Sequence, residues 1–285
     1  LVTMLHRAQE WPDTKRQLEV AFGDTRHFAV HDAVPPTFGD EGAANFMRLC
    51  AAHDAPGLEI FVYGEEGGRF PARQNRRASE AIARRHGVSN ALFVAQSQIA
   101  IDAGAFHNDV VAVANGNVLF AHEHAFADAA GLKADLARRM PDAVYVEVPA
   151  SAVSLEDAIK SYLFNSQLLT LPDGSMALVL PIEAEETPSV KAYLAALVAG
   201  NGPIRQLVPV DVRQSMRNGH RRILAVMPTG AGKGATIAVM VQSAADRGKR
   251  VLILAHRKEL IADLSKRISW LGIDHGISTQ LFRSR

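Results

Sequence analysis

Two stretches of the sequence share one order of expected elements: strand, tight turn, strand, helix, strand. In residues 109–148 two apolar runs flank Asn115-Gly116, and a helical pattern and a third apolar run follow. The same order recurs in residues 166–212 around Asp173-Gly174. A tight Asn-Gly or Asp-Gly turn between apolar runs favours a β-hairpin. The sequence therefore predicts two β-β-α-β units in tandem.

A weaker third copy of the unit precedes these two. It comprises an expected strand over 58–64, a helix over 76–87 and a strand over 91–97. In the last unit, Thr187 and Pro188 have the residue types expected at a helix N-cap and at the first helical position. Repeats of this kind can close radially into a propeller. We therefore predict an α+β fold whose first part is an incomplete propeller of ββαβ units.

From about residue 222 the pattern changes to strand, Gly-rich loop, helix, strand and helix. Strands that alternate with helices of this length are typical of parallel α/β units. Two strands are too little sheet for a complete domain of that class. We therefore divide the chain into residues 1–219 and a partial P-loop segment over residues 220–285.

The charge is unevenly distributed between these parts. Residues 217–285 carry 13 Lys and Arg against 4 Asp and Glu, whereas the whole chain of 285 residues has a net charge of only +1. A basic segment of this kind can face nucleotide or nucleic acid. Without an apolar run of about 18 residues, no membrane partner is expected. The single cysteine of the sequence is consistent with a reducing cytoplasm. The sequence leaves open whether the chain forms a homo-oligomer.

Four polar residues upstream of the change are candidates for chemistry. His107 and Asp109 stand two apart at the start of an expected strand, so both side chains would project to one face. Glu41 lies in a Gly-rich loop before a helical stretch, and Arg73 follows a proline and an alanine. Each has an ordinary alternative: a structural histidine, a turn-capping aspartate, a helix N-terminal charge and a solvated surface arginine.

Taken together, these segments resemble the N-succinylarginine dihydrolase family over residues 1–219. The segments that carry the resemblance are GDEGAANFMRL, FPARQNRRASEA, FHNDVVAV, YLFNSQLL and DVRQSMRNG. The resemblance implies the pentein fold, a propeller of ββαβ units. It also implies hydrolysis of the guanidinium group of N2-succinylarginine to N2-succinylornithine, carbon dioxide and ammonia, with no cofactor and no metal.

The resemblance also implies roles for residues of this chain. Glu41 and His107 fall on the catalytic carboxylate and the general acid/base of the family. The implied substrate-binding positions are His6, Arg7, Arg73, Asp109 and Asn218. These types suit the substrate, because carboxylates accept paired N–H bonds from a guanidinium group and arginines bind carboxylates. A histidine titrating near neutral pH can protonate departing ammonia and then activate water.

The sequence departs from the family directly after Asn218-Gly219. There the family continues to its nucleophilic cysteine, whereas this chain continues with residues 220–222, His-Arg-Arg. Thiolate attack on the guanidinium carbon requires that cysteine. Cys50, in a segment that we expect to be a helix with apolar spacing, is predicted to be a buried, inert thiol. The expected consequence is a dihydrolase-like chain without activity.

The downstream segment contains the Gly-rich loop PTGAGKG after an apolar strand. Its Gly230, Gly232 and Lys233 are the residues that would cradle phosphates. With the motif AHRKEL further on, the segment resembles the start of the nucleotide-binding domain of superfamily 2 helicases. ATP and Mg²⁺ are the ligands that such a loop would bind, but Gly234 stands where a Mg²⁺-binding hydroxyl residue is expected. A solvated basic surface is the alternative.

Three hypotheses remain open at this point. The first, favoured by the length of the resemblance, is a dihydrolase fragment with its nucleophile lost. The second is a nucleotide- or nucleic-acid-binding module that carries the propeller part as an appended body. The third is a chimeric reading frame without activity, because residues 211–230 read as either family and contain no linker.

Overall fold

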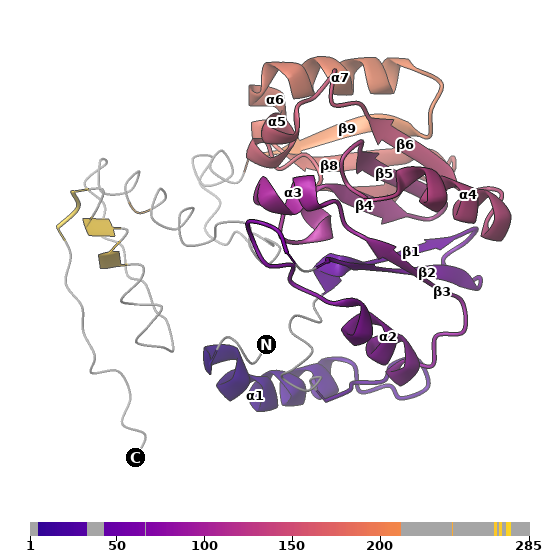
Figure 1. Ribbon diagram of the computed structural model, residues 1–285, viewed down its shortest axis with the longest axis vertical. Coiled ribbons are helices and arrows are strands. Elements are labelled where there is room, and N and C mark those ends of the chain that lie inside the picture. The colour runs from indigo at the N-terminus through magenta and orange to yellow at the C-terminus, as the bar shows by residue number, and fades with distance from the viewer. Residues whose placement is uncertain are drawn as a thin grey trace. The chain divides into compact units, whose positions relative to one another are not determined.

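The computed structural model describes residues 5–32, 43–65 and 67–211, with only the backbone for residues 5–10 and 43. In the C-terminal part it describes residues 241, 265, 266, 268, 269 and 272–274. The chain divides into two compact units, Leu1–Val210 and Asp211–Arg285. The strands, helices and phosphate-binding loop predicted between residues 222 and 256 lie outside the described residues, apart from Val241. Figure 1 shows the first unit.

The described part of the first unit contains three three-stranded sheets, and all have the same topology. In each, an antiparallel hairpin is followed by a third strand that pairs parallel to the second. The strands are β1 (Phe46–Cys50), β2 (Gly57–Tyr63), β3 (Ala91–Ala95), β4 (Ala112–Asn115), β5 (Val118–His122), β6 (Val144–Val148), β7 (Gln167–Thr170), β8 (Met176–Pro181) and β9 (Ile204–Val210). The predicted β-β-α-β units and the mixed α+β class are therefore confirmed.

The connecting helices are the predicted ones. The second and third strands of the three sheets are joined across α2 (Arg76–Arg85), α4 (Ala129–Arg139) and α7 (Pro188–Ala199). In Figure 1, α2 and α7 lie on opposite outer sides of the stacked sheets. Thr187 is the N-cap of α7 and Pro188 its first residue, as predicted. The remaining helices are α1 (Leu5–Ala21), α3 (Gln98–Asp102), α5 (Leu155–Lys160), α6 (Glu183–Glu186) and the 3-10 turns η2 (Ala43–Asn45) and η3 (Asn108–Val110).

The segment around Cys50 is a strand, and the predicted helix is wrong. Met47 and Leu49 are buried and alternate with Phe46 and Arg48, which are more exposed. This period of two was hidden because short apolar runs fit either element. β1 gives the first ββαβ repeat the same set of strands as the other two repeats. The predicted burial of Cys50 is confirmed, since the residue is 2% exposed.

The middle sheet is buried on both faces. Along β5, Leu119 and Ala121 pack into a core shared with the first sheet, whereas Val118 and Phe120 pack into a core shared with the third. Such a strand reads as a continuous apolar run and not as an alternation. The two cores therefore join three sheets into one body.

The first strands of the three sheets are neighbours: β1 contacts β4, and β4 contacts β7. At their ends, the Cys50 N–H donates to Gly116 O over 2.8 Å. His53 Nε2 lies 3.0 Å from Asn115 Oδ1, and Asn115 Nδ2 donates to Thr170 Oγ1 over 3.0 Å. The hairpin tips of all three sheets therefore lie at one end, which we call the tip end.

It follows that the residues before β1, β4 and β7 gather at the opposite end of these strands. We call residues 43–45, 107–111 and 162–166 the upstream end. A direct contact between η2 and η3 confirms that the starts of β1 and β4 meet there. The fold thus brings three segments, each about 60 residues from the next, to one end of the first unit.

The hairpin turn at residue 116 differs in detail from the predicted Asn115-Gly116 turn. Asn115 pairs with Val118, so the turn residues are Gly116 and Asn117. Gly116 has φ +54°, a conformation that glycine adopts without the steric cost of a side chain. Among the described residues, no helix combines the length and apolar character needed to cross a membrane.

Candidate active site

His107 lies at the upstream end, but not on a strand. It is the N-cap of η3, with φ −121° and ψ 150°, and its carbonyl oxygen accepts a hydrogen bond from Val110 N over 3.2 Å. The prediction that His107 and Asp109 project to one face of a strand is therefore wrong, since β4 begins only at Ala112. A 3-10 turn has three residues per turn, so positions two apart point in different directions. His107 is 4% exposed and Asp109 is half-buried.

Asn45 joins the Gly-rich GDEGAAN motif to the His107 segment. Its Oδ1 accepts a hydrogen bond from the backbone N–H of Asn108 over 3.1 Å. Asn108 Nδ2 in turn lies 3.4 Å from Met47 Sδ at the start of β1. Both asparagines are almost fully buried, at 2% and 1% exposed. Glu41 itself lies outside the described residues, four positions before Asn45.

Arg73 packs on the residue that precedes His107. Its guanidinium carbon lies 5.6 Å from the centre of the Phe106 ring, a cation–π distance. Phe106 also meets Phe70 edge to face, with 5.2 Å between ring centres. Arg73 is half-buried. The structure brings Arg73 and the His107 segment together through the Phe106 ring.

The loop that carries Arg73 is held at both ends. The Gly64 N–H donates to Gln74 O over 2.9 Å. Asp102 Oδ1 accepts hydrogen bonds from the Phe70 N–H at 3.2 Å and from Gln98 Nε2 at 2.9 Å. The bond from Gln98 is the main reason why the pKa of Asp102 lies below its usual value. The position of Arg73 is thus set by backbone contacts on both sides.

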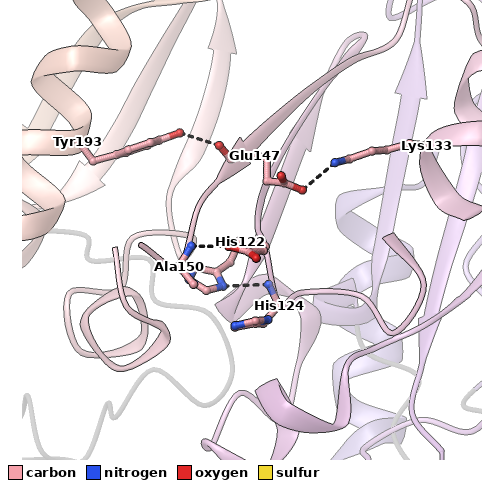
Figure 2. A network of polar contacts seen from close by, with 7 residues as sticks. His122, His124, Lys133, Glu147, Ala150 and Tyr193 are labelled. Carbon is pink, nitrogen blue, oxygen red and sulfur yellow. Dashed lines mark hydrogen bonds and ion pairs between the residues drawn. The ribbon is translucent and has the colours of Figure 1, made fainter. Parts of the chain in front are cut away.

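A second histidine, which the sequence did not single out, lies in a network beside the site (Figure 2). His122 is fully buried, and its Nδ1 accepts a hydrogen bond from His124 N over 3.1 Å. Its Nε2 therefore carries the proton and donates it to Val153 O over 3.0 Å. Burial is the main cause that lowers the pKa of His122. With both ring nitrogens occupied, His122 is a neutral structural group and not an acid or base.

The same network joins the second sheet to α7. Figure 2 shows Lys133 and Tyr193 approaching Glu147 from opposite sides. Lys133 Nζ lies 2.8 Å from the Glu147 carboxylate, and the Tyr193 hydroxyl donates to the backbone oxygen of Glu147 over 3.0 Å. Burial raises the pKa of Tyr193 to about 12. Tyr193 therefore stays a hydrogen-bond donor at neutral pH.

Several predicted site residues cannot be placed beside His107. Within α1, His6 and Arg7 are described by their backbone only. Five others lie outside the described residues: Glu41, Asn218, Gly230, Gly232 and Lys233. Within the described ranges, no three side chains of His, Cys, Asp or Glu gather as metal ligands would. The upstream end is thus described by His107, Asp109, Arg73 and the asparagines around them.

Comparison with known proteins gives two family matches. The family described as succinylarginine dihydrolase matches residues 1–222. The family described as the res subunit of type III restriction enzymes matches residues 204–279. The matches overlap over residues 204–222, the stretch in which the sequence changes character.

Curated relatives match the first part of the chain. The N-succinylarginine dihydrolase of Novosphingobium aromaticivorans is 66% identical over 221 residues, which are 77% of this chain and 52% of the relative. That of Sphingopyxis alaskensis is 63% identical over 221 residues, with 77% and 53% covered. The chain spans about half the length of these relatives.

One solved structure is similar at a low level. It is the product-bound N-terminal domain of ArgZ, an arginine dihydrolase from the ornithine–ammonia cycle in cyanobacteria. The sequences are 16% identical, the TM-score is 0.41, and the match covers 68% of this chain and 58% of that one. At this TM-score the likeness carries no argument.

Proposed function

The chain belongs to the succinylarginine dihydrolase family, and from this premise we propose that its first unit binds N2-succinylarginine without completing its hydrolysis. The observation that carries the proposal is the arrangement of residues at the upstream end. There the almost fully buried His107 adjoins both the end of the GDEGAAN motif and the Phe106 ring that holds Arg73. Motifs about 30 to 60 residues apart in the sequence therefore gather around one histidine.

In this proposal each group has a chemical task. His107 stands where it would protonate departing ammonia and activate water, and Glu41 and Asp109 each accept an N–H bond from the planar cation. Arg73, with His6 and Arg7, binds the remainder of the substrate, in which the succinyl carboxylate suits a guanidinium partner. No metal or cofactor takes part.

The missing step is the formation of a covalent intermediate. Cys50 is the one cysteine of the sequence, and it is buried at the tip end of β1, with its N–H bonded to Gly116 O. The upstream end, with His107, lies at the other end of that strand. A thiolate must be accessible and close to an activating base to act as a nucleophile. We therefore propose binding without turnover.

Two measurements on the full chain test this function. Isothermal titration calorimetry should show binding of N2-succinylarginine, and Arg73→Ala should weaken it by about tenfold or more, as expected when a charged hydrogen bond is lost. A coupled ammonia assay should show no release. A titration in which the wild-type chain shows no binding would refute the binding proposal. Ammonia release that persists in Cys50→Ala would show that another group is the nucleophile.

The three sheets also support a proposal for the fold. Their shared topology and the adjacency of β1, β4 and β7 are what a pentein-type propeller of ββαβ units requires. The cytoplasmic location, the absence of a membrane partner and a homo-oligomer stay predictions.

The second family match favours a separate candidate function for residues 220–285. We propose that this segment is a partial P-loop unit, and that the change from the dihydrolase sequence to it lies within residues 204–222. Its basic charge suits nucleic acid, and Gly230, Gly232 and Lys233 suit phosphates. An ATP titration with Mg²⁺ tests it: a binding signal that Lys233→Ala abolishes supports this function, and the lack of any such signal removes it.

A further inference from the structure

Buried polar atoms without a hydrogen-bond partner are concentrated at the upstream end. Among the described residues, four such atoms belong to Asn45 (Nδ2), Asn108 (Oδ1), Asn165 (Oδ1) and Ser166 (Oγ), whereas Tyr145 Oη lies apart from them on β6. All four residues come shortly before the first strand of a sheet. Buried polar groups in folded proteins are nearly always paired, so a cluster of unpaired ones requires an explanation. Their common location suggests that a bound molecule supplies the partners.

Asn165 and Ser166 come from the third ββαβ repeat, and the family resemblance assigns them no role in the site. Their place follows from the direction of β7. Asn115 ends β4 and Thr170 ends β7, and their side chains are hydrogen bonded at the tip end. The two strands are neighbours and have four residues each. Ser166, one residue before β7, therefore lies at the same level as Val111, one residue before β4.

The backbone before β7 is built to turn this segment toward the upstream end. Tyr162 has φ +55°, and it is the one non-glycine residue with positive φ in the described part of the chain. Such a conformation is strained for a residue with a side chain and persists where the surroundings impose it, often at functional sites. Asn165 N donates to Tyr162 O over 3.1 Å, and Phe164 packs against Phe120. The turn thus buries Phe164 and leaves Asn165 and Ser166 before the strand.

We propose that Asn165 and Ser166 bind the guanidinium group of the substrate, together with Asn108. This inference rests on the proposed function and adds residues of the third ββαβ repeat to the site. A guanidinium group has five N–H donors and no acceptor. The unpaired oxygens of Asn108, Asn165 and Ser166 are all acceptors, so the chemistry is complementary. The unpaired Asn45 Nδ2 is a donor, so it does not bind the guanidinium group.

The proposal predicts a contrast between two ligands. N2-succinylarginine carries the guanidinium group, whereas N2-succinylornithine shares the succinyl end and lacks it. By calorimetry on the full chain, Asn165→Ala should weaken binding of N2-succinylarginine by about tenfold and leave that of N2-succinylornithine within about twofold. Arg73→Ala, which affects the shared end, should weaken both ligands. Asn117→Ala, whose amide binds Asp142 O at the tip end, is the matched control and should change neither.

Each outcome decides something. A wild-type chain that binds neither ligand would refute the proposed function and this inference with it. Normal binding of both ligands by the wild type, by Asn165→Ala and by Ser166→Ala would refute the inference alone. An equal loss for both ligands would show a structural role instead. If Asn165→Ala does not fold, Ser166→Ala decides, because it removes a single oxygen atom and should weaken only N2-succinylarginine binding.

Discussion

His107 and His122 show how differently two buried histidines of one unit can be used. The backbone N–H of His122 donates to Val111 O, directly after the η3 turn that His107 caps. His122 has both ring nitrogens bonded to the backbone, so its proton is fixed. A fixed neutral histidine supports the segment beside His107 and does not exchange protons with a substrate.

His122 should make the protein less stable in acid. Its folded pKa is lowered chiefly by burial, whereas a histidine in the unfolded chain titrates near pH 6.5. Below about pH 6.5 the unfolded chain therefore binds a proton that the native state excludes, so the free energy of unfolding falls. His122→Gln should make this decrease shallower, by at most about 1.4 kcal/mol per pH unit. Urea unfolding between about pH 7.5 and pH 5.5 measures it.

His86 serves as the comparison for this experiment, because burial also lowers its pKa and its protonation acts in the same direction. His86→Gln should remove a separate part of the decrease in the free energy of unfolding with falling pH. Parallel pH profiles for the wild type and His122→Gln would contradict the assignment.

At the scale of elements, Gly64 controls the approach of the Arg73 loop to the end of β2. A Cβ atom built on Gly64 would overlap the Cβ of Ala72 and contact Ile101 Cδ1 at 3.1 Å. Ala72 directly precedes Arg73 in the chain, and its side chain is a single methyl group that cannot rotate aside. The absence of a side chain at residue 64 is therefore a condition for the observed path of the loop.

Gly64→Ala should destabilise the first unit by about 1–3 kcal/mol, the usual cost of overpacking, and should weaken N2-succinylarginine binding through the displaced Arg73. Chemical denaturation and calorimetry measure the two effects. Gly202→Ala is the matched control, since a Cβ there meets nothing within 4 Å, and its effect should stay within about 0.5 kcal/mol. Equal stabilities for both variants would show that the loop has room to shift.

The elements that could be predicted are those with local signals. Turn glycines and helix caps placed both complete units, including Thr187 and Pro188. The strand that contains Cys50 and the η3 turn could not be predicted, because contacts far along the chain decide them: β1 is set by its pairing with β2, and η3 by the bond from Asn108 N to Asn45, 63 residues away. The signal available for Asn165 and Ser166 was their position before the first strand of a repeat.

For the whole first unit, the middle sheet is the common support, because it faces both hydrophobic cores. Leu119 and Phe120 are adjacent in sequence, yet they pack into different cores. A body joined in this way should unfold as one cooperative unit.

Leu119→Ala tests this cooperativity. It should lower the free energy of unfolding by about 2–5 kcal/mol and should also reduce hydrogen-exchange protection in β8, which lies in the core that Leu119 does not enter. Exchange measured by mass spectrometry reports both. A loss of protection confined to the first two sheets would show independent units. Val20→Ala, at a largely exposed position of α1, should change neither quantity appreciably.

The amide of Asn115 bridges His53 and Thr170 and so clamps the three hairpin tips together. In mechanical terms this clamp is a fulcrum, and β4 is a lever arm of about 13 Å, at about 3.3 Å per residue. A rotation of about 5° at the tips displaces the opposite end by about 1 Å, a misplacement that matters for the alignment of reacting groups. Side chains at the tip end, opposite His107, therefore influence how accurately the three segments around it are aligned.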